Sequence, residues 1–317
     1  MASQLQQQND NINNDRVLKA VLWDMDGTLI DSEPYWHEVE MGIAREHGGF
    51  WSEDIGWTCS GKPVPQVAQR MIDEGTQLSV DEIGRLMIEG VAQKEAERMP
   101  WIPGVEDVLR SLVAAGIPSV LVTASPRRMA ENLVRQAPEG AFVGYVCSDD
   151  DLPKKPNPAP YLAAAEVIGI NVPQEIAVAN GMPVSGSGRP GLQLGDGEPS
   201  QQSGDSESSR QNSGNQSGQQ VSDGKSDKKV SDDKIDGISE HADFCRDMAR
   251  CVAIEDSMTG IQSAAASGAT TIAQTGFIKT DTSAGPQFAS INGYDGLTAE
   301  VLERYAEQRL AAMSQMK

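Results

Sequence analysis

The sequence has few cysteines and no long hydrophobic run. Its four cysteines, Cys59, Cys147, Cys245 and Cys251, form no CxxC pair, which excludes a disulfide-rich scaffold and favours free thiols in a reducing compartment. No apolar run approaches the roughly 18–20 residues that a helix needs to span a bilayer. The first twenty residues have neither a basic start nor an apolar stretch. We therefore expect no signal peptide and a cytoplasmic location.

Positively charged residues are also scarce: 26 Lys and Arg stand against 46 Asp and Glu, a net charge of −20. This balance argues against nucleic acid and anionic membranes as partners. It gives no long-range attraction for an anionic substrate either, so a phosphate site must create its attraction locally. The three histidines, His37, His47 and His241, show no metal-ligand spacing. We interpret them as structural or surface residues.

Short apolar runs alternate with helical patterns along most of the chain. Residues 17–23, VLKAVLW, predict a strand buried on both faces. Further strands are predicted at SVLVT, AFVGYVCS, CVAIEDS and TTIAQ, and helices at residues 105–113, PYLAAAEVIGI and SMTGIQSAAASGA. This alternation predicts an α/β fold, a Rossmann-like parallel sheet with crossover helices.

Two regions depart from this alternation. Residues 34–99 contain helical patterns with charged faces, and Ser79 and Glu82 are spaced as a capping box. We predict a helical subdomain there, inserted into a core of residues 17–33 and 100–317. The Gln- and Asn-rich residues 1–16 are predicted to form a disordered tail.

A long polar segment interrupts the core at about residues 175–246. It consists mainly of Ser, Gly, Gln, Asp and Lys, and no Phe, Trp or Tyr occurs from Leu162 to Asp243. Such a composition cannot bury enough apolar surface to offset its ordering entropy, so we predict a disordered insertion. Loop-closure entropy grows slowly with length, so an insertion of this size is tolerable on the surface of a domain.

Reactive side chains follow several of the predicted strands. They are Asp24 and Asp26 after the first strand, Thr123 and Ser125 after the second, Glu255 and Asp256 after the fourth, and Lys155 at the start of the helix that precedes the fourth. Parallel α/β sheets bind ligands at the carboxyl ends of their strands. We therefore expect these groups to converge on one site.

This set of motifs resembles the haloacid dehalogenase superfamily of phosphotransferases. DMDGT looks like its first motif, the Thr of LVTAS its second, the Lys of KKPNPAPYL its third and the acids of IEDS its fourth. The resemblance covers most of residues 17–310 without the insertion, and it is closest to the β-phosphoglucomutase-like phosphatases. It implies that residues 34–99 are an α-helical cap.

The resemblance also implies a role for each motif residue. Asp24 is expected to be the nucleophile that forms an aspartyl-phosphate, and Asp26 the general acid and later the base. Thr123 and Lys155 are expected to bind the phosphoryl oxygens. The expected cofactor is Mg²⁺, held by Asp24, Asp256 and the backbone carbonyl of Asp26, with Glu255 either a ligand or a group behind the ligands. Ser125 either contacts phosphate or caps the next helix, and Asp31 is expected to fix the turn after the first strand.

The charges of these groups predict that metal is needed. Asp24, Asp26, Glu255 and Asp256 carry about −4 when ionised, and Mg²⁺ with Lys155 returns about +3. Without the metal, the site should repel a phosphate dianion.

The segment CSGKPVPQ looks like the substrate-specificity loop of the cap, with Gly61 in its turn and Ser60 or Lys62 facing the substrate. β-Phosphoglucomutase has a Lys, an Arg and a His at the positions of Ser60, Val64 and Trp36, which weakens a mutase assignment. The leading hypothesis is a monomeric Mg²⁺-dependent phosphatase for a small phosphorylated metabolite of the sugar or polyol class. The alternatives are a phosphosugar mutase and a scaffold that recruits partners through the insertion.

Overall fold

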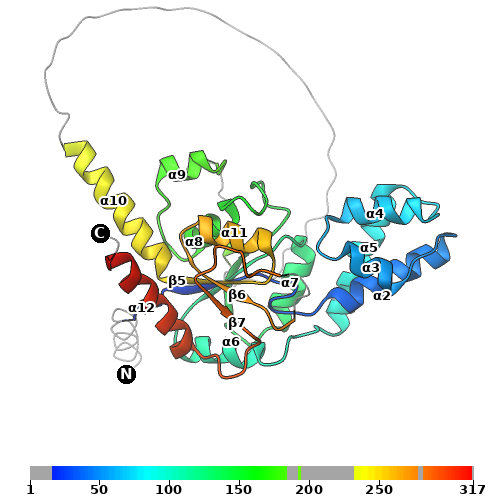
Figure 1. Ribbon diagram of the computed structural model, residues 1–317, viewed down its shortest axis with the longest axis horizontal. Coiled ribbons are helices and arrows are strands. Elements are labelled where there is room, and N and C mark those ends of the chain that lie inside the picture. Colours follow the sequence, from blue (N-terminus) through cyan, green and yellow to red (C-terminus); the bar gives the residue numbers. More distant parts are fainter. Residues whose placement is uncertain (1–15, 184–191, 194–231, 278–280, 316–317) are drawn as a thin grey trace, which may run out of the picture.

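The computed structural model describes residues 16–183, 192–193, 232–277 and 281–315 of the 317-residue chain (Figure 1). Its centre is a sheet with the strand order β4-β3-β2-β1-β5-β6-β7. The parallel strands are β1 (Ala20–Trp23), β2 (Ser119–Val122), β3 (Phe142–Val146), β5 (Cys251–Glu255), β6 (Thr270–Gln274) and β7 (Ala289–Ile291). The two-residue strand β4 (Leu192–Gln193) pairs antiparallel with β3. The parallel α/β fold predicted from the sequence is confirmed.

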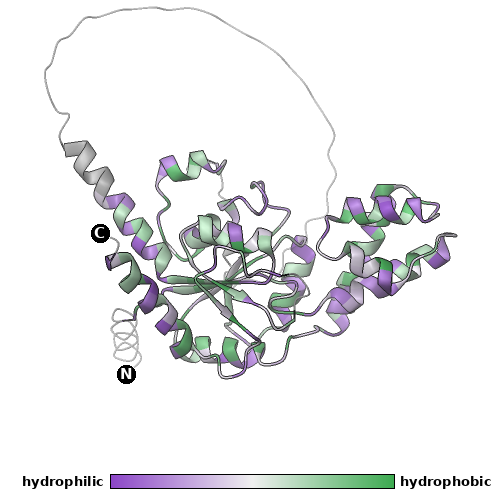
Figure 2. Cartoon of the chain, viewed as in Figure 1, coloured by the Kyte–Doolittle hydropathy of each residue, from purple (hydrophilic) through white to green (hydrophobic). Residues whose placement is uncertain are grey.

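Both faces of the sheet are buried, as the apolar sequence of β1 predicts. Val21 and Trp23 belong to one apolar cluster and Ala20 and Leu22 to another, and all four side chains are fully buried. The first cluster includes residues of α6 (Val105–Ala114), α7 (Arg127–Gln136) and α12 (Ala299–Gln315), and the second includes residues of α8 (Ala159–Val167), α10 (Asp232–Ala249) and α11 (Met258–Ala266). Figure 2 shows the hydrophobic strands at the centre and polar residues on the outer helices.

Four helices form a separate group beside the sheet (Figure 1). They are α2 (Glu33–Glu46), α3 (Glu53–Cys59), α4 (Val64–Asp73) and α5 (Val80–Glu97). They pack around their own apolar cluster, which includes Ile43, Met71 and Met87. The predicted capping box is present at the start of α5, where Ser79 and Glu82 exchange hydrogen bonds. The segment therefore has the helical character that its sequence predicted.

The prediction of disorder from 175 to 246 is wrong at both ends of that range. Helix α9 (Gln174–Ala179) begins at the first end, and α10 occupies the last part. Composition misled the prediction because a few apolar residues suffice to anchor a helix: Phe244 of α10 is buried in the apolar cluster that includes Ala20 and Leu22. Residues 184–191 and 194–231, most of the predicted insertion, and residues 1–15 of the predicted tail lie outside the described residues.

The structure bears on two features of the sequence, its few cysteines and its lack of long apolar runs. Cys59, Cys147, Cys245 and Cys251 are all free thiols, as predicted. Among the helices of the described residues, we find none with the length and apolar character needed to cross a membrane.

One buried carboxyl in this fold has an unusual environment. Glu95, on α5 where that helix packs against α7, is completely buried, and neither of its carboxyl oxygens has a hydrogen-bond partner within the described residues. Burial, and then repulsion by Asp26, raises the pKa of Glu95 to about 9. The folded protein therefore keeps a proton on Glu95 that the unfolded chain releases above its ordinary pKa.

Stability is expected to depend on pH through Glu95. Between about pH 4.5 and pH 9, the unfolded chain binds fewer protons than the folded chain, so the free energy of unfolding falls as pH rises. At pH 7, this decrease amounts to on the order of 3 kcal/mol relative to acidic pH, where both states are protonated. Glu95→Gln should remove this contribution. Chemical denaturation of wild type and variant at pH 5, 7 and 9 measures it, with the exposed Glu97→Gln on the same helix as the matched control. If the free energies of unfolding of wild type and Glu95→Gln changed equally with pH, the protonated state assigned to Glu95 would be contradicted.

Candidate active site

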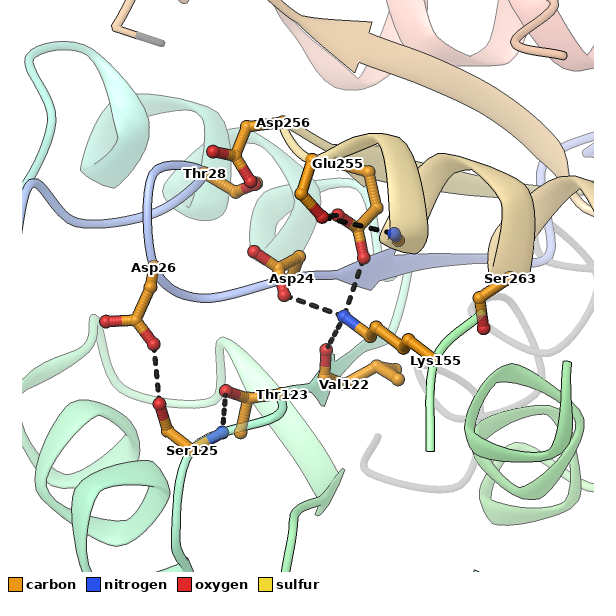
Figure 3. A network of polar contacts seen from close by, with 12 residues as sticks. Asp24, Asp26, Thr28, Val122, Thr123, Ser125, Lys155, Glu255, Asp256 and Ser263 are labelled. Atoms are coloured by element: carbon orange, nitrogen blue, oxygen red, sulfur yellow. Dashed lines mark hydrogen bonds and ion pairs between the residues drawn. The ribbon is translucent and has the colours of Figure 1, made fainter. Parts of the chain in front are cut away.

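The chain turns sharply where β1 ends. The backbone N–H groups of the three residues after Gly27 donate to the carbonyl of Met25, and Gly27 itself has φ +81°. L-residues with a side chain rarely adopt this conformation, so glycine suits the turn. The turn separates two neighbouring acids: Asp24 stays at the end of the strand, and Asp26 points away from it toward Ser125 (Figure 3).

Lys155 forms hydrogen bonds with residues at the ends of three strands. Its Nζ donates to Oδ1 of Asp24 at 2.7 Å, to Oε1 of Glu255 at 2.6 Å and to the carbonyl of Val122 at 2.9 Å (Figure 3). Burial alone lowers the pKa of a lysine, but the carboxylates of Asp24 and Glu255 outweigh it, and the pKa of Lys155 lies above its usual value. Lys155 is therefore a permanent cation within the site.

Glu255 is fully buried and held by several contacts. The hydroxyl of Tyr161 on α8 donates to its Oε1 at 2.6 Å, and the hydroxyl of Ser257 donates to its Oε2 at 3.3 Å. A Cβ on Gly260, in the first turn of α11, would overlap the carboxylate, so a residue without a side chain is needed there. Burial, and then repulsion by Asp24, raises the pKa of Glu255. The contacts of Glu255 fix the position of Lys155.

Three carboxylates lie close enough to share one cation. One oxygen each from Asp24, Glu255 and Asp256 lies within 4.8 Å of the others. Burial, and then repulsion by Asp24 and Glu255, raises the pKa of Asp256 well above its usual value. Lys155 offsets only one of the three negative charges, so a divalent cation bound here would relieve the remaining repulsion. A set of carboxylate oxygens is what Mg²⁺ prefers, so these residues fit the predicted metal.

Asp26 is hydrogen-bonded to two serines. The Ser32 hydroxyl donates to its Oδ1 at 2.5 Å and the Ser125 hydroxyl donates to its Oδ2 at 2.6 Å. Burial raises the pKa of Asp26, and this outweighs the lowering by the two serine hydrogen bonds; repulsion by Asp24 and Glu33 adds to the increase. A carboxyl of this kind holds a proton more readily than an exposed aspartate does.

Thr123 and Ser125 lie beside these acids at the end of β2. The Thr123 side chain is buried, and its hydroxyl oxygen accepts a hydrogen bond from the backbone N–H of Ser125 at 2.9 Å. The residue at the N-cap of α7 is Pro126, so Ser125 does not cap that helix. Its side chain instead holds Asp26, a contact that neither of the two sequence-based alternatives included.

The predicted substrate loop lies between α3 and α4. Gly61 has φ +73°, which agrees with the predicted turn, and Lys62 is exposed. The hydroxyl of Ser60 donates to Oε2 of Glu33 at 2.9 Å, and Glu33 begins α2. Ser60 is thus linked to the segment that follows the first motif. For Gly61 and Lys62, we see no contact with the strand-end residues in the described part of the chain.

The site contains residues that the sequence did not single out. Ser32 looks like an ordinary helix N-cap, but its side chain makes no capping hydrogen bond and holds Asp26 instead. Tyr161 lies in an apolar helical stretch, and only the fold brings it to Glu255. Asp31 was predicted to fix the turn after the first strand, but its side chain is exposed. Backbone hydrogen bonds to the carbonyl of Met25 hold the turn instead.

The sequence of residues 18–179 matches the haloacid dehalogenase-like hydrolases, and this match spans more than half of the chain. The chain belongs to this family. The protein is therefore an enzyme, and similar curated proteins are phosphatases. A phosphorylated carbohydrates phosphatase from Thermotoga maritima is 29% identical over 51% of this chain and 75% of its own length. A phosphoglycolate phosphatase from Chromobacterium violaceum is 32% identical, with the same coverage of 51% and 75%.

Solved structures agree with the family fold. The β-phosphoglucomutase of Clostridium difficile superimposes with a TM-score of 0.56 over 93% of this chain and 99% of its own, at 11% sequence identity. At so low an identity, the likeness supports the fold of this haloacid dehalogenase-like hydrolase and says nothing about its substrate.

The turn at Gly27 gives a test of this hydrolase's geometry. A Cβ at Gly27 would overlap Oδ2 of Asp256, so Gly27→Ala should displace that carboxylate and lower kcat/KM by about 100-fold. The matched control is Gly169→Ala: Gly169 has the same φ of +81°, but no atom lies within 4 Å of its added Cβ. Both variants should lose about 1–2 kcal/mol of stability. Equal loss of activity in both would show that displacement of Asp256 is not the cause.

Proposed function

We propose that this hydrolase is a Mg²⁺-dependent phosphatase that acts on a small phosphorylated metabolite of the sugar or polyol class through an aspartyl-phosphate. The observation that carries the proposal is the arrangement of Asp24 and Asp26. One oxygen of Asp24 is held by Lys155, and the other points away from it (Figure 3). Asp26 points away from Asp24 and is partly buried, and its desolvation raises the pKa of its carboxyl above the usual value.

In the first step, Asp24 attacks phosphorus. The bond between phosphorus and the leaving oxygen breaks as the bond to the Asp24 carboxylate forms. Asp26 gives its proton to the leaving oxygen, so the product departs as an alcohol. The serine hydrogen bonds to both oxygens of Asp26 hold its carboxyl in position for this transfer.

In the second step, Asp26 acts as the base. Its carboxylate takes a proton from water, the water oxygen attacks phosphorus, and the bond to Asp24 breaks. This step releases inorganic phosphate, and Asp24 and Asp26 return to their starting protonation states.

The phosphoryl oxygens need positive charge and hydrogen-bond donors in both steps. We assign the hydroxyl of Thr123 and the ammonium group of Lys155 to them, with Ser125 and the loop residues Gly61 and Lys62 proposed to contact substrate. Asp24, Asp256 and Glu255, with the backbone carbonyl of Asp26, would hold Mg²⁺. When bound, the metal supplies the charge that neutralises phosphate among these carboxylates.

The substrate class is proposed from the helical group and from the relatives. We assign residues 34–99 as a cap that covers the core and contacts the leaving group. The similar phosphatase from Thermotoga maritima carries phosphorylated carbohydrates in its name. The mutase alternative is weaker because Ser60, Val64 and Trp36 supply no cation for the second phosphate of a sugar bisphosphate.

A screen of phosphorylated metabolites tests this function. Phosphate release from sugar and polyol monophosphates is measured with Mg²⁺, after addition of EDTA, and after Mg²⁺ is restored. We expect release only when the metal is present, and Asp24→Asn should abolish it. Wild-type rates in Asp24→Asn would refute the nucleophile. Sustained transfer to a sugar acceptor in place of water would favour the mutase.

A further inference from the structure

Glu33 is a charged side chain beside the site for which the proposed mechanism has no use. It begins α2 directly after Ser32, whose hydroxyl donates to Asp26 at 2.5 Å. Its side chain is 33% exposed, so it is accessible to a ligand. Because Asp26 is proposed to protonate the leaving oxygen, a bound substrate would place the rest of its leaving group near Ser32 and Glu33.

Contacts from two sides hold this carboxylate. Ser60 donates to its Oε2 at 2.9 Å from the loop after α3, and Nε2 of His37 lies 3.3 Å from the same oxygen. The ring of His37 is buried, and it meets the ring of Trp57 edge-on with centroids 4.6 Å apart. Glu33 thus connects the start of α2 with the predicted substrate loop and has a defined orientation.

We infer that Glu33 is a specificity-determining residue that selects phosphate esters whose leaving group carries hydroxyls and no second anionic group. The inference rests on the proposed function and narrows its substrate class. A carboxylate accepts hydrogen bonds from hydroxyl groups and repels another anion at short range. The net charge of −20 also disfavours a substrate that carries a second anionic group. Sugar and polyol monophosphates fit this site, whereas sugar bisphosphates and phosphoglycolate, whose leaving group carries a carboxylate, do not.

The test compares kcat/KM for sorbitol 6-phosphate, glucosamine 6-phosphate, fructose 1,6-bisphosphate and 2-phosphoglycolate. We expect wild type to prefer sorbitol 6-phosphate over 2-phosphoglycolate by about 100-fold. Glu33→Gln removes the charge and keeps an acceptor for Ser60, and it should lower this ratio by about tenfold, mainly through KM. Glucosamine 6-phosphate shows whether an ammonium group in the leaving group adds to the preference.

Glu46→Gln is the matched control, because it makes the same charge change at an exposed position in the last turn of α2. It should leave the substrate ratio unchanged, and thermal unfolding should show both variants folded. An unchanged ratio in Glu33→Gln would overturn the inference while leaving the phosphatase assignment intact. A wild-type preference for the bisphosphate that disappears in Lys62→Gln would overturn it as well. Absence of any hydrolysis that depends on Asp24 would overturn the proposed function and the inference together.

Discussion

Asp26→Asn is expected to lower the turnover of a sugar or polyol phosphate by about 1,000-fold, because an amide can neither protonate the leaving oxygen nor deprotonate water. An ester with a good leaving group needs no proton in the first step. With p-nitrophenyl phosphate, the variant should therefore release about one nitrophenol per enzyme in a burst and then turn over slowly, since the second step still lacks its base. Rapid-mixing absorbance measurements resolve the two phases.

Asp31→Asn is the matched control for this substitution. Asp31 lies in the same acidic segment five residues later, but its side chain is exposed and the turn beside it is held by backbone hydrogen bonds. The variant should keep near wild-type turnover with both kinds of ester. An equal loss in the two variants would mean that negative charge in this segment, and not proton transfer by Asp26, accounts for the effect.

The second large effect is expected at Lys155. Lys155→Met leaves Asp24 and Glu255 facing each other without the ammonium group that both contact, at sites where their side chains are only 11% and 0% exposed. Removing one partner of a buried ion pair costs about 3–5 kcal/mol of stability. Turnover should fall by about 1,000-fold or more, since the phosphoryl oxygens lose a cation and Asp24 loses its position. Steady-state kinetics and chemical denaturation measure the two losses.

A double variant separates these effects. In Lys155→Met with Glu255→Gln, the repulsion is reduced, so stability should partly recover while activity stays low. Lys154→Met is the matched control: the Nζ of Lys154 donates to the carbonyls of Ser148 and Asp150, away from the carboxylates. Recovery of activity in the double variant would show that Lys155 has only a structural role.

The sheet could be predicted from the sequence because its inner strands are short apolar runs. β1, β2 and β5 are buried along their whole length, so nearly every residue in them had to be apolar. β7 could not be recognised: it has three residues at the sheet edge, partly exposed, and carries no apolar run. Helix α10 was missed because its buried residue Phe244 follows a long polar segment that dominated the composition.

The grouping of the candidate site residues could be predicted where short sequence motifs carry them, and it could not be predicted where the fold alone creates a contact. Asp24, Asp26 and the acid pair after β5 stand in short motifs, and the structure brings them to one end of the sheet with Lys155. Tyr161 reaches Glu255 across 94 residues of sequence. No local pattern marks a tyrosine in an apolar helix as the donor to a buried carboxylate. Glu95 likewise looks like an exposed helical acid until the packing of α5 buries it.

The most direct test of the account is to detect the phosphoryl group on Asp24. The Asp26→Asn enzyme is mixed with p-nitrophenyl phosphate and Mg²⁺, quenched in acid within the burst, digested and examined by mass spectrometry. We predict that the peptide containing residues 22–33 gains the mass of one phosphoryl group, located on Asp24, and that Asp24→Asn with Asp26→Asn shows no such gain. A full burst with an unmodified Asp24 peptide, or with phosphate on another residue, would contradict the proposed nucleophile.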